Sequence, residues 1–335
     1  MKAISYDRNG DSSVLALIER EVREPAPGEV RVRVVVSGVN PTDWKARANN
    51  PLSGPKVPNQ DGAGVIHAIG EGVTGLAIGD RVWLWDVAWQ TSEGTAQQFV
   101  TLPASHAVAL PDSESFDTGA SLGIPALTAH LALTVNESGP DRLAPHALDG
   151  RIVLVTGGAG AVGHAAIQLA VWAGATVIAT VSGGSKAELA RAAGAHHVIN
   201  YRDERVADAV LAIAPNGVHT IVDVNIIANI EADLAVIAPN GTIASYADAP
   251  ANLVAIPVRG SMSKNTRFQF ILTYTSSSEA KANAVAAVSE ALAAGALHVG
   301  EDDGLPLARF PLAETAAAHD AVENGFVGKV LIDVE

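Results

Sequence analysis

The sequence predicts an α/β protein in which a doubly wound parallel sheet accompanies a small barrel-like β domain. Up to about residue 118, short strand-like runs alternate with turn signals, as at residues 31–36, 62–70 and 79–85. Such spacing favours a barrel. From about Ser121 to Tyr246, alanine-rich helical segments alternate with strands, which is typical of a parallel, doubly wound sheet.

The strongest local pattern is a strand, a tight turn and a helix within residues 151–163. Residues 152–155 are apolar and mostly β-branched, and glycines follow them. The segment 158–163 fits G-x-G-x-x-G, whose glycines permit a sharp turn and close approach of the backbone to a pyrophosphate. The residues predicted to hold the phosphates, at the N-terminus of the following helix, are Gly157, Gly158, Gly160, Ala161, Val162 and Gly163.

The residues after the turn complete a βαβ unit. The predicted helix over 161–173 stops at Gly174, a residue suited to the left-handed position after a helix. Residues 176–181 then form a second apolar strand, and the whole unit takes the roughly 30 residues expected of this crossover. This context favours dinucleotide binding, and the alternative is a βαβ unit with a purely structural role.

Composition excludes several classes of function. The chain has 335 residues, enough for two domains, and a formal charge of −14, which argues against a general nucleic-acid or anionic-membrane surface. It has no cysteine, so disulfides, thiol catalysis and cysteine zinc sites are excluded. The start reads as a strand, not a signal peptide, and no apolar run approaches the ~20 residues that span a bilayer. We therefore expect a soluble, cytoplasmic protein with no membrane insertion.

Several further motifs follow one another along the chain. They are GVNPTDWK (38–45), NQDGAG (59–64), GDRV (79–82), GIPALTA (123–129), the glycine turn and GKVL (328–331). Their order and spacing resemble those of the medium-chain dehydrogenase/reductase superfamily, in particular its zinc-free NADPH:quinone oxidoreductase branch. The resemblance implies a GroES-like β-barrel catalytic domain over 1–119, completed by 266–335. It also implies a Rossmann NADPH-binding domain over 120–265, with the active site in the cleft between the domains.

Two positions argue against a catalytic zinc. Asn40 and Gln60 stand where the zinc-dependent relatives carry cysteine and histidine, and a neutral amide is a poor zinc ligand. The histidines on strand-like patterns, such as His67 and His106, lack ligand spacing. We therefore predict that the chain has no metal site.

The end of the second Rossmann strand predicts which nicotinamide cofactor binds. Residues 181–186 contain no acid to accept from a ribose 2′-hydroxyl, whereas Ser182 and Ser185 can donate and Lys186 is positively charged. The resemblance implies that Lys186 and Tyr201 contact a 2′-phosphate, which predicts NADPH. Alternatively, Lys186 is a solvated residue at the start of a helix and Tyr201 a loop aromatic.

The resemblance also implies contacts elsewhere along the cofactor. Asn40 and Thr128 are expected at the nicotinamide end, and Asn324 stands where many relatives place an arginine near the cofactor. Residues 225–226 depart from the glycine that relatives commonly have there. The walls around the cofactor are expected to include Tyr246, Ile271 and Thr273.

Without zinc, the expected chemistry is hydride transfer from the nicotinamide to a small quinone or enone, which needs positioning and modest oxyanion stabilisation. Asn40 and Gln60 can donate amide N–H groups to the developing oxyanion, and Lys45 can add positive charge or help to deliver a proton. Alternatively, these amides brace a loop and Lys45 is solvated. Trp85 and Trp89 are expected to line the substrate pocket.

Two alternative functions, an expected mode of assembly and a closing strand complete the predictions. The same branch and chemistry include reductases of alkenals or enoyl thioesters, and the fold alone also permits a non-catalytic NADPH-binding protein. Residues 268–274 form an apolar run that we expect at the edge of the Rossmann sheet. In the resembling family this edge pairs across a two-fold axis, which predicts a homodimer. Residues 327–333 are expected to return to the first domain.

Overall fold

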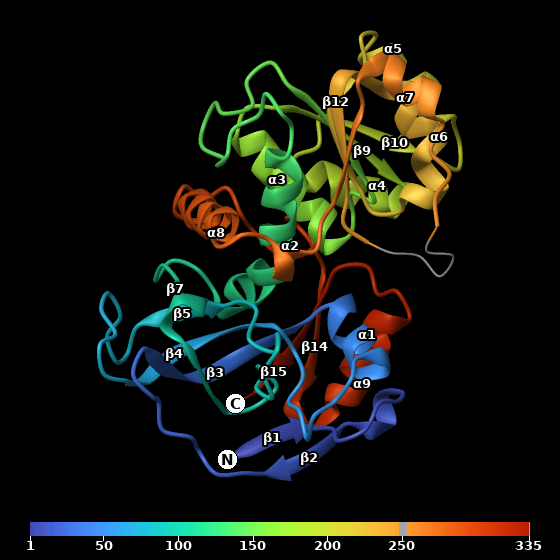
Figure 1. The fold of residues 1–335 in the computed structure, drawn as a ribbon. Helices are drawn as coiled ribbons and strands as arrows, with labels where there is room; N and C mark the ends of the chain where they lie inside the picture. Colours follow the sequence, from blue (N-terminus) through green and yellow to red (C-terminus); the bar gives the residue numbers. More distant parts are fainter. Residues whose placement is uncertain (248–252, 335) are drawn as a thin grey trace. The chain divides into compact units, whose positions relative to one another are not determined.

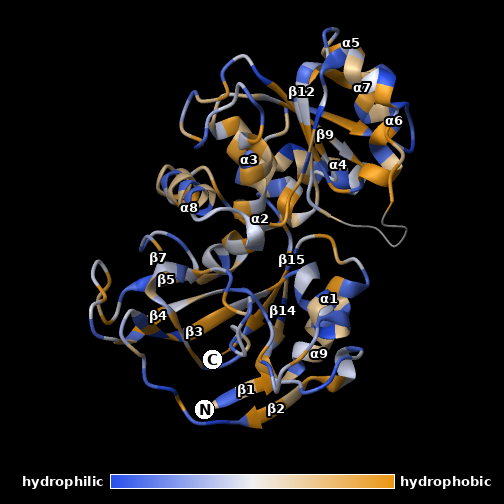
Figure 2. Ribbon diagram, viewed as in Figure 1, coloured by the Kyte–Doolittle hydropathy of each residue, from blue (hydrophilic) through white to orange (hydrophobic). Residues whose placement is uncertain are grey.

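The structure is a computed structural model that describes residues 1–247 and 253–334 (Figure 1). Its strands form a six-stranded sheet, a seven-stranded sheet and a separate two-stranded ladder. Hydrophobic residues run along β3 (Glu29–Val39) and α3 (Ala161–Trp172), as Figure 2 shows. Most of these side chains are buried, so each element contributes to a hydrophobic core.

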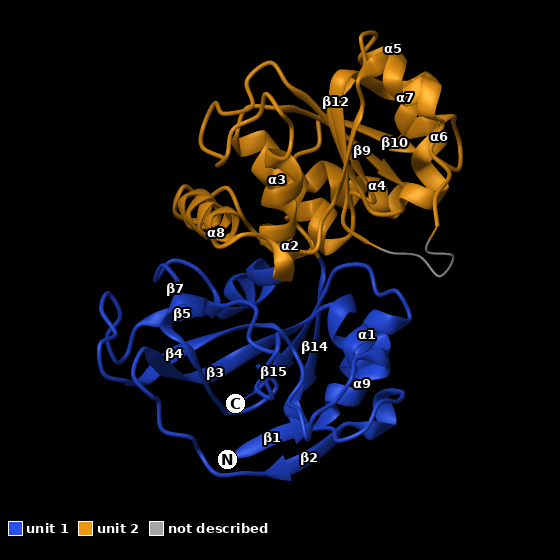
Figure 3. Cartoon of the chain, viewed as in Figure 1, with its two compact units in different colours: residues 1–124, 306–335 blue, residues 125–305 orange. Residues whose placement is uncertain are grey.

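The chain divides into two compact units (Figure 3). Unit 1 comprises residues 1–124 and 306–335, and unit 2 comprises residues 125–305. The first crossing lies within α2 (Phe116–Thr134), which contains Pro125, close to the expected boundary at 119. The return to unit 1 lies at Pro306, later than the expected residue 266, because β13 (Arg267–Phe270) pairs with β12 (Ile237–Ser245) in the sheet of unit 2.

Unit 2 is built on a parallel sheet with the strand order β10-β9-β8-β11-β12-β13. Besides β12 and β13, its strands are β8 (Ile152–Thr156), β9 (Thr176–Val181), β10 (His197–Asn200) and β11 (Val218–Asp223). Besides α3, its helices are α4 (Gly184–Ala192), α5 (Val206–Ile213), α6 (Ile226–Val236), α7 (Val258–Lys264), the 3₁₀ turn η3 (Thr273–Thr275) and α8 (Ser278–Ala293). Successive strands lie to one side of β8 and then to the other, so the doubly wound, Rossmann-type prediction is confirmed.

Two local features explain where elements of unit 2 end. After α3, Gly174 has a φ of +92°, and a Cβ there would lie 2.0 Å from Asp149 Oδ1, so the turn requires glycine. The expected strand over 268–274 ends early, at Phe270. Its neighbour β12 ends at Ser245, which pairs with Phe270, and among the described residues none pairs as a strand with the chain beyond Phe270.

Unit 1 contains the seven-stranded sheet, in which most neighbouring strands are antiparallel. Its path is β14-β15-β3-β4-β5-β7, and β6 also pairs with β3. Besides β3, the strands of unit 1 are β1 (Lys2–Ser5), β2 (Ala16–Glu19), β4 (Asp61–Ile69), β5 (Arg81–Leu84), β6 (Phe99–Pro103), β7 (Ala107–Ala109), β14 (Leu307–Pro311) and β15 (Lys329–Asp333). Its helices are η1 (Ser12–Val14), α1 (Pro41–Asn49), η2 (Ala104–His106), η4 (Leu312–Glu314), α9 (Thr315–Glu323) and the start of α2.

The strand β15 completes unit 1 from the far end of the chain. It runs antiparallel to β3 and parallel to β14, and it lies between them. Val330 and Ile332 join the same buried core as Val32 and Val34. Unit 1 is therefore discontinuous in sequence.

Candidate functional site

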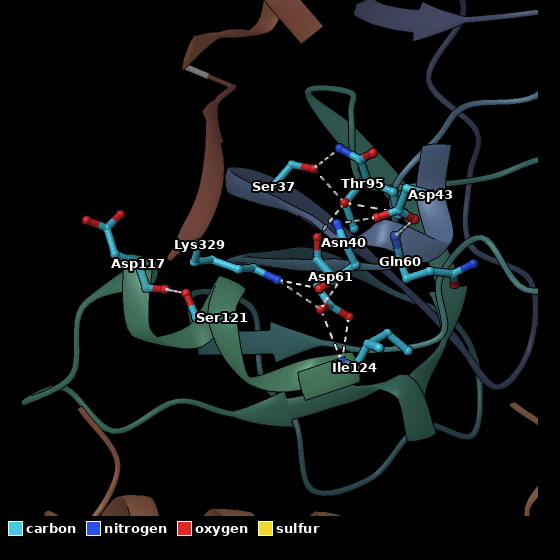
Figure 4. Close-up of polar contacts among 11 residues, drawn as sticks. Ser37, Asn40, Asp43, Gln60, Asp61, Thr95, Asp117, Ser121, Ile124 and Lys329 are labelled. Atoms are coloured by element: carbon cyan, nitrogen blue, oxygen red, sulfur yellow. Dashed lines mark hydrogen bonds and ion pairs between the residues drawn. The ribbon is translucent and has the colours of Figure 1, made fainter. Parts of the chain in front are cut away.

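A buried polar cluster lies where β3 leads into α1 (Figure 4). Asn40 is the N-cap residue of α1 and is only 2% exposed. Its Nδ2 donates to Asp61 Oδ2 at 2.6 Å, and its Oδ1 accepts from Lys329 Nζ at 2.7 Å. Two charged side chains therefore hold the two ends of one neutral amide.

Lys329 and Asp61 form a buried ion pair. Lys329 Nζ lies 3.4 Å from Asp61 Oδ2, and the two side chains are 1% and 0% exposed. Both Asp61 oxygens also accept from the backbone N–H of Ile124. Burial lowers the pKa of Lys329 and raises the pKa of Asp61, and each charge opposes the shift of the other. Removing either partner alone would leave an uncompensated buried charge.

Asp43, in the first turn of α1, braces the backbone at both amide positions. Its Oδ2 accepts from the backbone N–H of Asn40 at 2.7 Å, and its Oδ1 accepts from the backbone N–H of Gln60 at 3.2 Å. Burial, with a further contribution from the charge of Asp61, raises the pKa of Asp43 to about 7. Asn40 and Gln60 are thus brought together by a shared carboxyl group.

The Gln60 side chain is oriented by a loop of unit 1. Its Oε1 accepts from the backbone N–H of Ala88 at 3.0 Å, so its amide oxygen is already hydrogen-bonded within the protein. Within residues 1–247 and 253–334, no acceptor is found for Gln60 Nε2. The N–H groups of this amide are therefore its remaining polar functions.

The same loop carries the tryptophans predicted to line a substrate pocket. Trp85 is 7% exposed and stacks on His106, with ring centroids 4.4 Å apart. Trp89 is half-buried, whereas Trp83 on β5 is fully buried and belongs to the core. The peptide hydrogen bond from Val87 N–H to the Gln60 carbonyl ties this loop to the polar cluster.

Two other predicted residues lie elsewhere in unit 1. Lys45, on α1, is half-buried with its Nζ 5.9 Å from the centroid of the Trp44 ring. Asn324 is exposed and is the C-cap residue of α9. Asn324 belongs to unit 1 and the glycine turn to unit 2, so a contact of Asn324 with the cofactor stays a prediction.

The glycine turn of unit 2 has the geometry of a phosphate cradle. Gly157 has a φ of +68°. A Cβ at Gly158 would lie 2.9 Å from Ala179 Cβ, and one at Gly163 would lie 2.4 Å from the Gly157 carbonyl oxygen. These glycines allow the turn to pack against β9 while α3 begins at Ala161. The first N–H groups of a helix are free, and glycines have no side chains to cover them. Such N–H groups fit a pyrophosphate.

Most of the other predicted residues of unit 2 follow the carboxyl ends of its parallel strands, and Thr128 lies in α2. The backbone N–H of Tyr201, after β10, donates to Val181 O at the end of β9, so Tyr201 lies beside the segment that leads to Lys186. Lys186 is half-buried in the first turn of α4. Thr128 and Thr273 lie in direct contact, with their hydroxyl oxygens 2.6 Å apart. Ser182 and Ser185 precede and begin α4, Ile271 follows β13, and Tyr246 follows β12.

Unit 2 contains a buried pair of acidic side chains, Asp223 at the end of β11 and Asp233 on α6. Asp223 Oδ2 accepts from Asn229 Nδ2 at 2.7 Å and from Thr156 Oγ1 at 3.2 Å. Burial, with the charge of Asp223 second, raises the pKa of Asp233 to about 9. Burial and Asp223 likewise raise the pKa of Tyr246. Asp233 therefore keeps a proton at neutral pH, and one negative charge is shared by the pair.

The sequence pattern did not indicate that the residues supporting the two amides belong to the site. Asp43, Asp61 and Lys329 lie within quoted motifs but were given no role. Lysine is rarely buried, so Lys329 is typically interpreted as solvated. The available signal is its position in an otherwise apolar strand, where an inward-facing lysine requires an acidic partner.

Comparisons with known proteins agree with this architecture. Residues 26–112 match the alcohol dehydrogenase GroES-like domain, and residues 161–290 match the zinc-binding dehydrogenase family. The chain is 31% identical to a 2-haloacrylate reductase of Burkholderia sp over 95% of this chain and 94% of that protein. It is 28% identical to a quinone oxidoreductase of Sus scrofa over 99% and 97% of the two chains.

Solved structures share the whole fold. A quinone oxidoreductase of Escherichia coli, complexed with NADPH, superposes with a TM-score of 0.80 at 25% identity over 99% of this chain and 100% of that chain. An NAD-dependent alcohol dehydrogenase gives a TM-score of 0.82 at 25% identity, with 100% of each chain covered. Similar folds therefore accompany both nicotinamide cofactors.

A GroES-like unit joined to a Rossmann unit with this glycine turn defines the class of medium-chain dehydrogenases and reductases. The chain belongs to the quinone oxidoreductase branch of the medium-chain dehydrogenase/reductase superfamily, and it is an oxidoreductase. No helix in the described part of the chain is both long and apolar enough to cross a membrane.

The zinc named in one family description does not fit the residues found here. The Asn40 oxygen, at the position of a zinc ligand in zinc-dependent relatives, accepts from the Lys329 ammonium, and a second cation there would be repelled. Gln60 offers no charge or thiolate, and its amide oxygen is already bonded. In the described ranges, no group of three or more acidic, histidine or cysteine side chains is placed to hold a metal ion.

Proposed function

We propose that this protein is a zinc-independent, NADPH-dependent oxidoreductase that transfers hydride to a quinone or a related enone. The observation that carries the proposal is the pair of amides, Asn40 and Gln60, braced by Asp43 where a metal site would otherwise lie. Such a site offers hydrogen bonds without a Lewis acid, which suits an acceptor that is already electrophilic. The relatives named as quinone oxidoreductases support the same class of substrate.

Bound NADPH would supply the hydride, and the protein would hold and orient it. In unit 2, the proposed pyrophosphate contacts are the free backbone N–H groups at the start of α3, residues 161–163, which the glycine turn of residues 157–160 leaves accessible. Lys186 with Tyr201, Ser182 and Ser185 would contact the 2′-phosphate. The complex of the Escherichia coli relative with NADPH supports this choice of cofactor. The remaining proposed contacts with the cofactor are Asn40, Thr128, Tyr246, Ile271, Thr273 and Asn324.

The substrate site is proposed in unit 1. The polar groups of Asn40 and Gln60 would face the reacting carbonyl oxygen, and Lys45 would add positive charge or help to deliver a proton. Trp85 and Trp89 would form an apolar wall for a flat acceptor, because both lie in the loop that holds Gln60.

A panel of acceptors tests the proposed reaction. NADPH oxidation by the purified protein is measured with small quinones, with enones and alkenals, and with simple ketones. We expect turnover with the quinones or enones and little with unactivated ketones, which need a Lewis acid. The absence of turnover with every acceptor, despite measurable NADPH binding, would favour a non-catalytic binding protein.

The second candidate function is reduction of an activated carbon–carbon double bond, as in alkenals or enoyl thioesters. Its support is the relative named 2-haloacrylate reductase, since an acrylate contains a double bond conjugated to a carboxylate. Analysis of the products distinguishes the two functions. A saturated carbonyl product indicates alkene reduction, whereas a hydroquinone indicates quinone reduction.

The cofactor choice leads to a first prediction. Lys186→Ala should weaken NADPH binding by about 10- to 100-fold, because one charge-assisted hydrogen bond to phosphate contributes roughly 1.5 to 3 kcal/mol. NADH binding, which lacks this contact, should change little. Tyr201 is 50% exposed, and Tyr201→Phe should give a smaller loss of the same kind. Titrations of both cofactors measure the effect.

Arg191 provides the matched control because it is exposed in the last turn of the same helix, α4. Arg191→Ala also removes one positive charge and should leave NADPH binding within about twofold of wild type. Equal losses for NADPH and NADH on Lys186→Ala, or a wild type that prefers NADH, would place the 2′-phosphate site elsewhere.

A second prediction concerns assembly. β13 is one of the two edge strands of the parallel sheet, and Phe270 and Leu272 are 58% and 53% exposed. An apolar edge of this kind is a template for pairing with another strand. We propose that two copies pair through β13 to form a homodimer with a continuous sheet.

Sedimentation equilibrium at micromolar concentration measures the dimer. Phe270→Lys should shift the protein toward monomer, because a charge on an edge strand opposes pairing. Phe326 is 40% exposed in unit 1, and Phe326→Lys serves as the control that keeps the dimer. A wild type that sediments only as a monomer would contradict the proposal.

A further inference from the structure

The orientation of a buried amide decides whether it offers a donor or an acceptor to a ligand. In an asparagine or glutamine, the oxygen accepts and the nitrogen donates, and a rotation of half a turn exchanges them. At Gln60, the backbone N–H of Ala88 occupies the oxygen. At Asn40, the oxygen faces the Lys329 ammonium and the nitrogen faces the Asp61 carboxylate. Both amides therefore have their oxygens bonded to protein donors.

The contacts at Asn40 specify one orientation strongly. A rotated amide would place Nδ2 against the Lys329 ammonium, donor against donor, and Oδ1 against the Asp61 carboxylate, acceptor against acceptor. Both contacts would be repulsive at distances of 2.6 and 2.7 Å between buried atoms. Burying the ion pair therefore costs desolvation free energy, but the pair excludes the rotated orientation of the Asn40 amide.

We propose that Lys329 and Asp61 are positioning residues that act through Asn40: they hold its amide so that the site offers N–H groups, from Asn40 and from Gln60, to a substrate oxygen that only accepts. This inference rests on the proposed function and deepens it. A site with donors alone is matched to the carbonyl oxygen of a quinone or enone and to the oxyanion that forms on hydride transfer. The second N–H of Asn40 Nδ2 and the N–H groups of Gln60 Nε2 are the donors.

Substitutions that test this role must release the Asn40 amide from its orientation without leaving an uncompensated buried charge. The double variant Lys329→Met with Asp61→Asn removes both charges together, and the amide introduced at position 61 can donate to Asn40 Oδ1, which favours the rotated Asn40 amide. The oxygen of the introduced amide can still accept from the backbone N–H of Ile124. Lys329→Arg keeps a cationic donor and is the conservative variant. Lys2→Met, on the exposed start of β1, is the lysine control.

The measurements are kcat and KM for the acceptor, the Kd of NADPH and the unfolding temperature. We expect the double variant to lose about 100-fold in kcat, the effect of losing one preorganised donor, with the NADPH Kd within about twofold of wild type. Lys329→Arg should recover most of the rate, and Lys2→Met should match wild type. A folded double variant with wild-type kcat would overturn the inference.

A double-mutant cycle with Asn40→Leu tests whether the pair acts through Asn40. In the Asn40→Leu background, the double variant should cause no further loss in kcat. A full additional loss there would mean that Lys329 or Asp61 contacts the substrate or the cofactor directly, and the positioning role would be wrong.

A measurement on the wild type needs neither activity nor a variant that folds. In protein labelled with ¹⁵N-asparagine, the Asn40 side-chain amide should exchange slowly with solvent and show one proton shifted by its carboxylate partner. A rapidly exchanging, unshifted Asn40 amide would overturn the inference. If no acceptor is turned over, the proposed function fails while this spectrum still tests the orientation of Asn40.

Discussion

Gly163→Ala is expected to lower the unfolding temperature by about 3–10 °C and to abolish measurable NADPH binding. A Cβ at this position would lie 2.4 Å from the Gly157 carbonyl oxygen and 3.0 Å from Gly158 Cα, both backbone atoms. The turn or the start of α3 must move, and overpacking of this kind costs roughly 1–3 kcal/mol. That movement also displaces the N–H groups proposed to hold the pyrophosphate.

Gly160→Ala is the matched substitution within the same motif. Its nearest neighbour would be the Gly157 oxygen at 3.4 Å, an ordinary contact, and its φ is −84°. Alanine at 160 should therefore leave the unfolding temperature nearly unchanged, yet weaken NADPH binding because the methyl group projects into the cradle. Calorimetry of both variants without cofactor, followed by NADPH titration, separates the two effects. Equal unfolding temperatures for the two variants would contradict the steric argument.

Asp233→Asn is expected to stabilise the protein, and increasingly so as the pH rises. The folded-state pKa of Asp233 is raised from its ordinary value of 3.8 to about 9. Between these values the folded state retains a proton that the unfolded state releases, so the free energy of unfolding of the wild type falls as pH rises. Asparagine has no proton to lose, and its N–H group can still donate to Asp223.

The gain should be roughly 4 kcal/mol at pH 7, larger at pH 8.5 and small at pH 4, below which Asp233 is protonated in both states. Calorimetric scans at these three pH values measure it. Glu231, exposed on the same helix, α6, supplies the control, since Glu231→Gln should not change the pH dependence. A gain that is independent of pH would show that Asp233 does not hold a proton in the folded state.

The parts of the fold that follow from local pattern were predicted closely. The strand before the glycine turn, α3 and β9 lie within a residue of the expected bounds, because turn chemistry and apolar periodicity act within a short stretch. The run over 268–274 was predicted too long. An apolar sequence favours a strand, but its length depends on the neighbour, β12, which ends at Ser245.

The candidate site was predicted only in part, because some of its contacts come from distant parts of the chain. Asn40 and Gln60 were selected because they replace zinc ligands in a known motif. Their supporting side chains could not be derived from local pattern, since Lys329 meets Asn40 from 289 positions away along the chain. The orientation of an amide depends on such partners and is specified only in the folded protein.

The discontinuity of unit 1 has a consequence for biosynthesis. β15 lies between β3 and β14 and brings in Lys329, so residues 1–124 leave the ribosome with an incomplete sheet and with Asp61 lacking its lysine partner. At a translation rate of ~5–20 residues per second, roughly 10 to 40 s pass while unit 2 is made. During that interval the edge of β3 and the hydrophobic residues beneath it are exposed to other chains. A nascent chain stalled just before residue 306 should therefore bind chaperones through its first 124 residues.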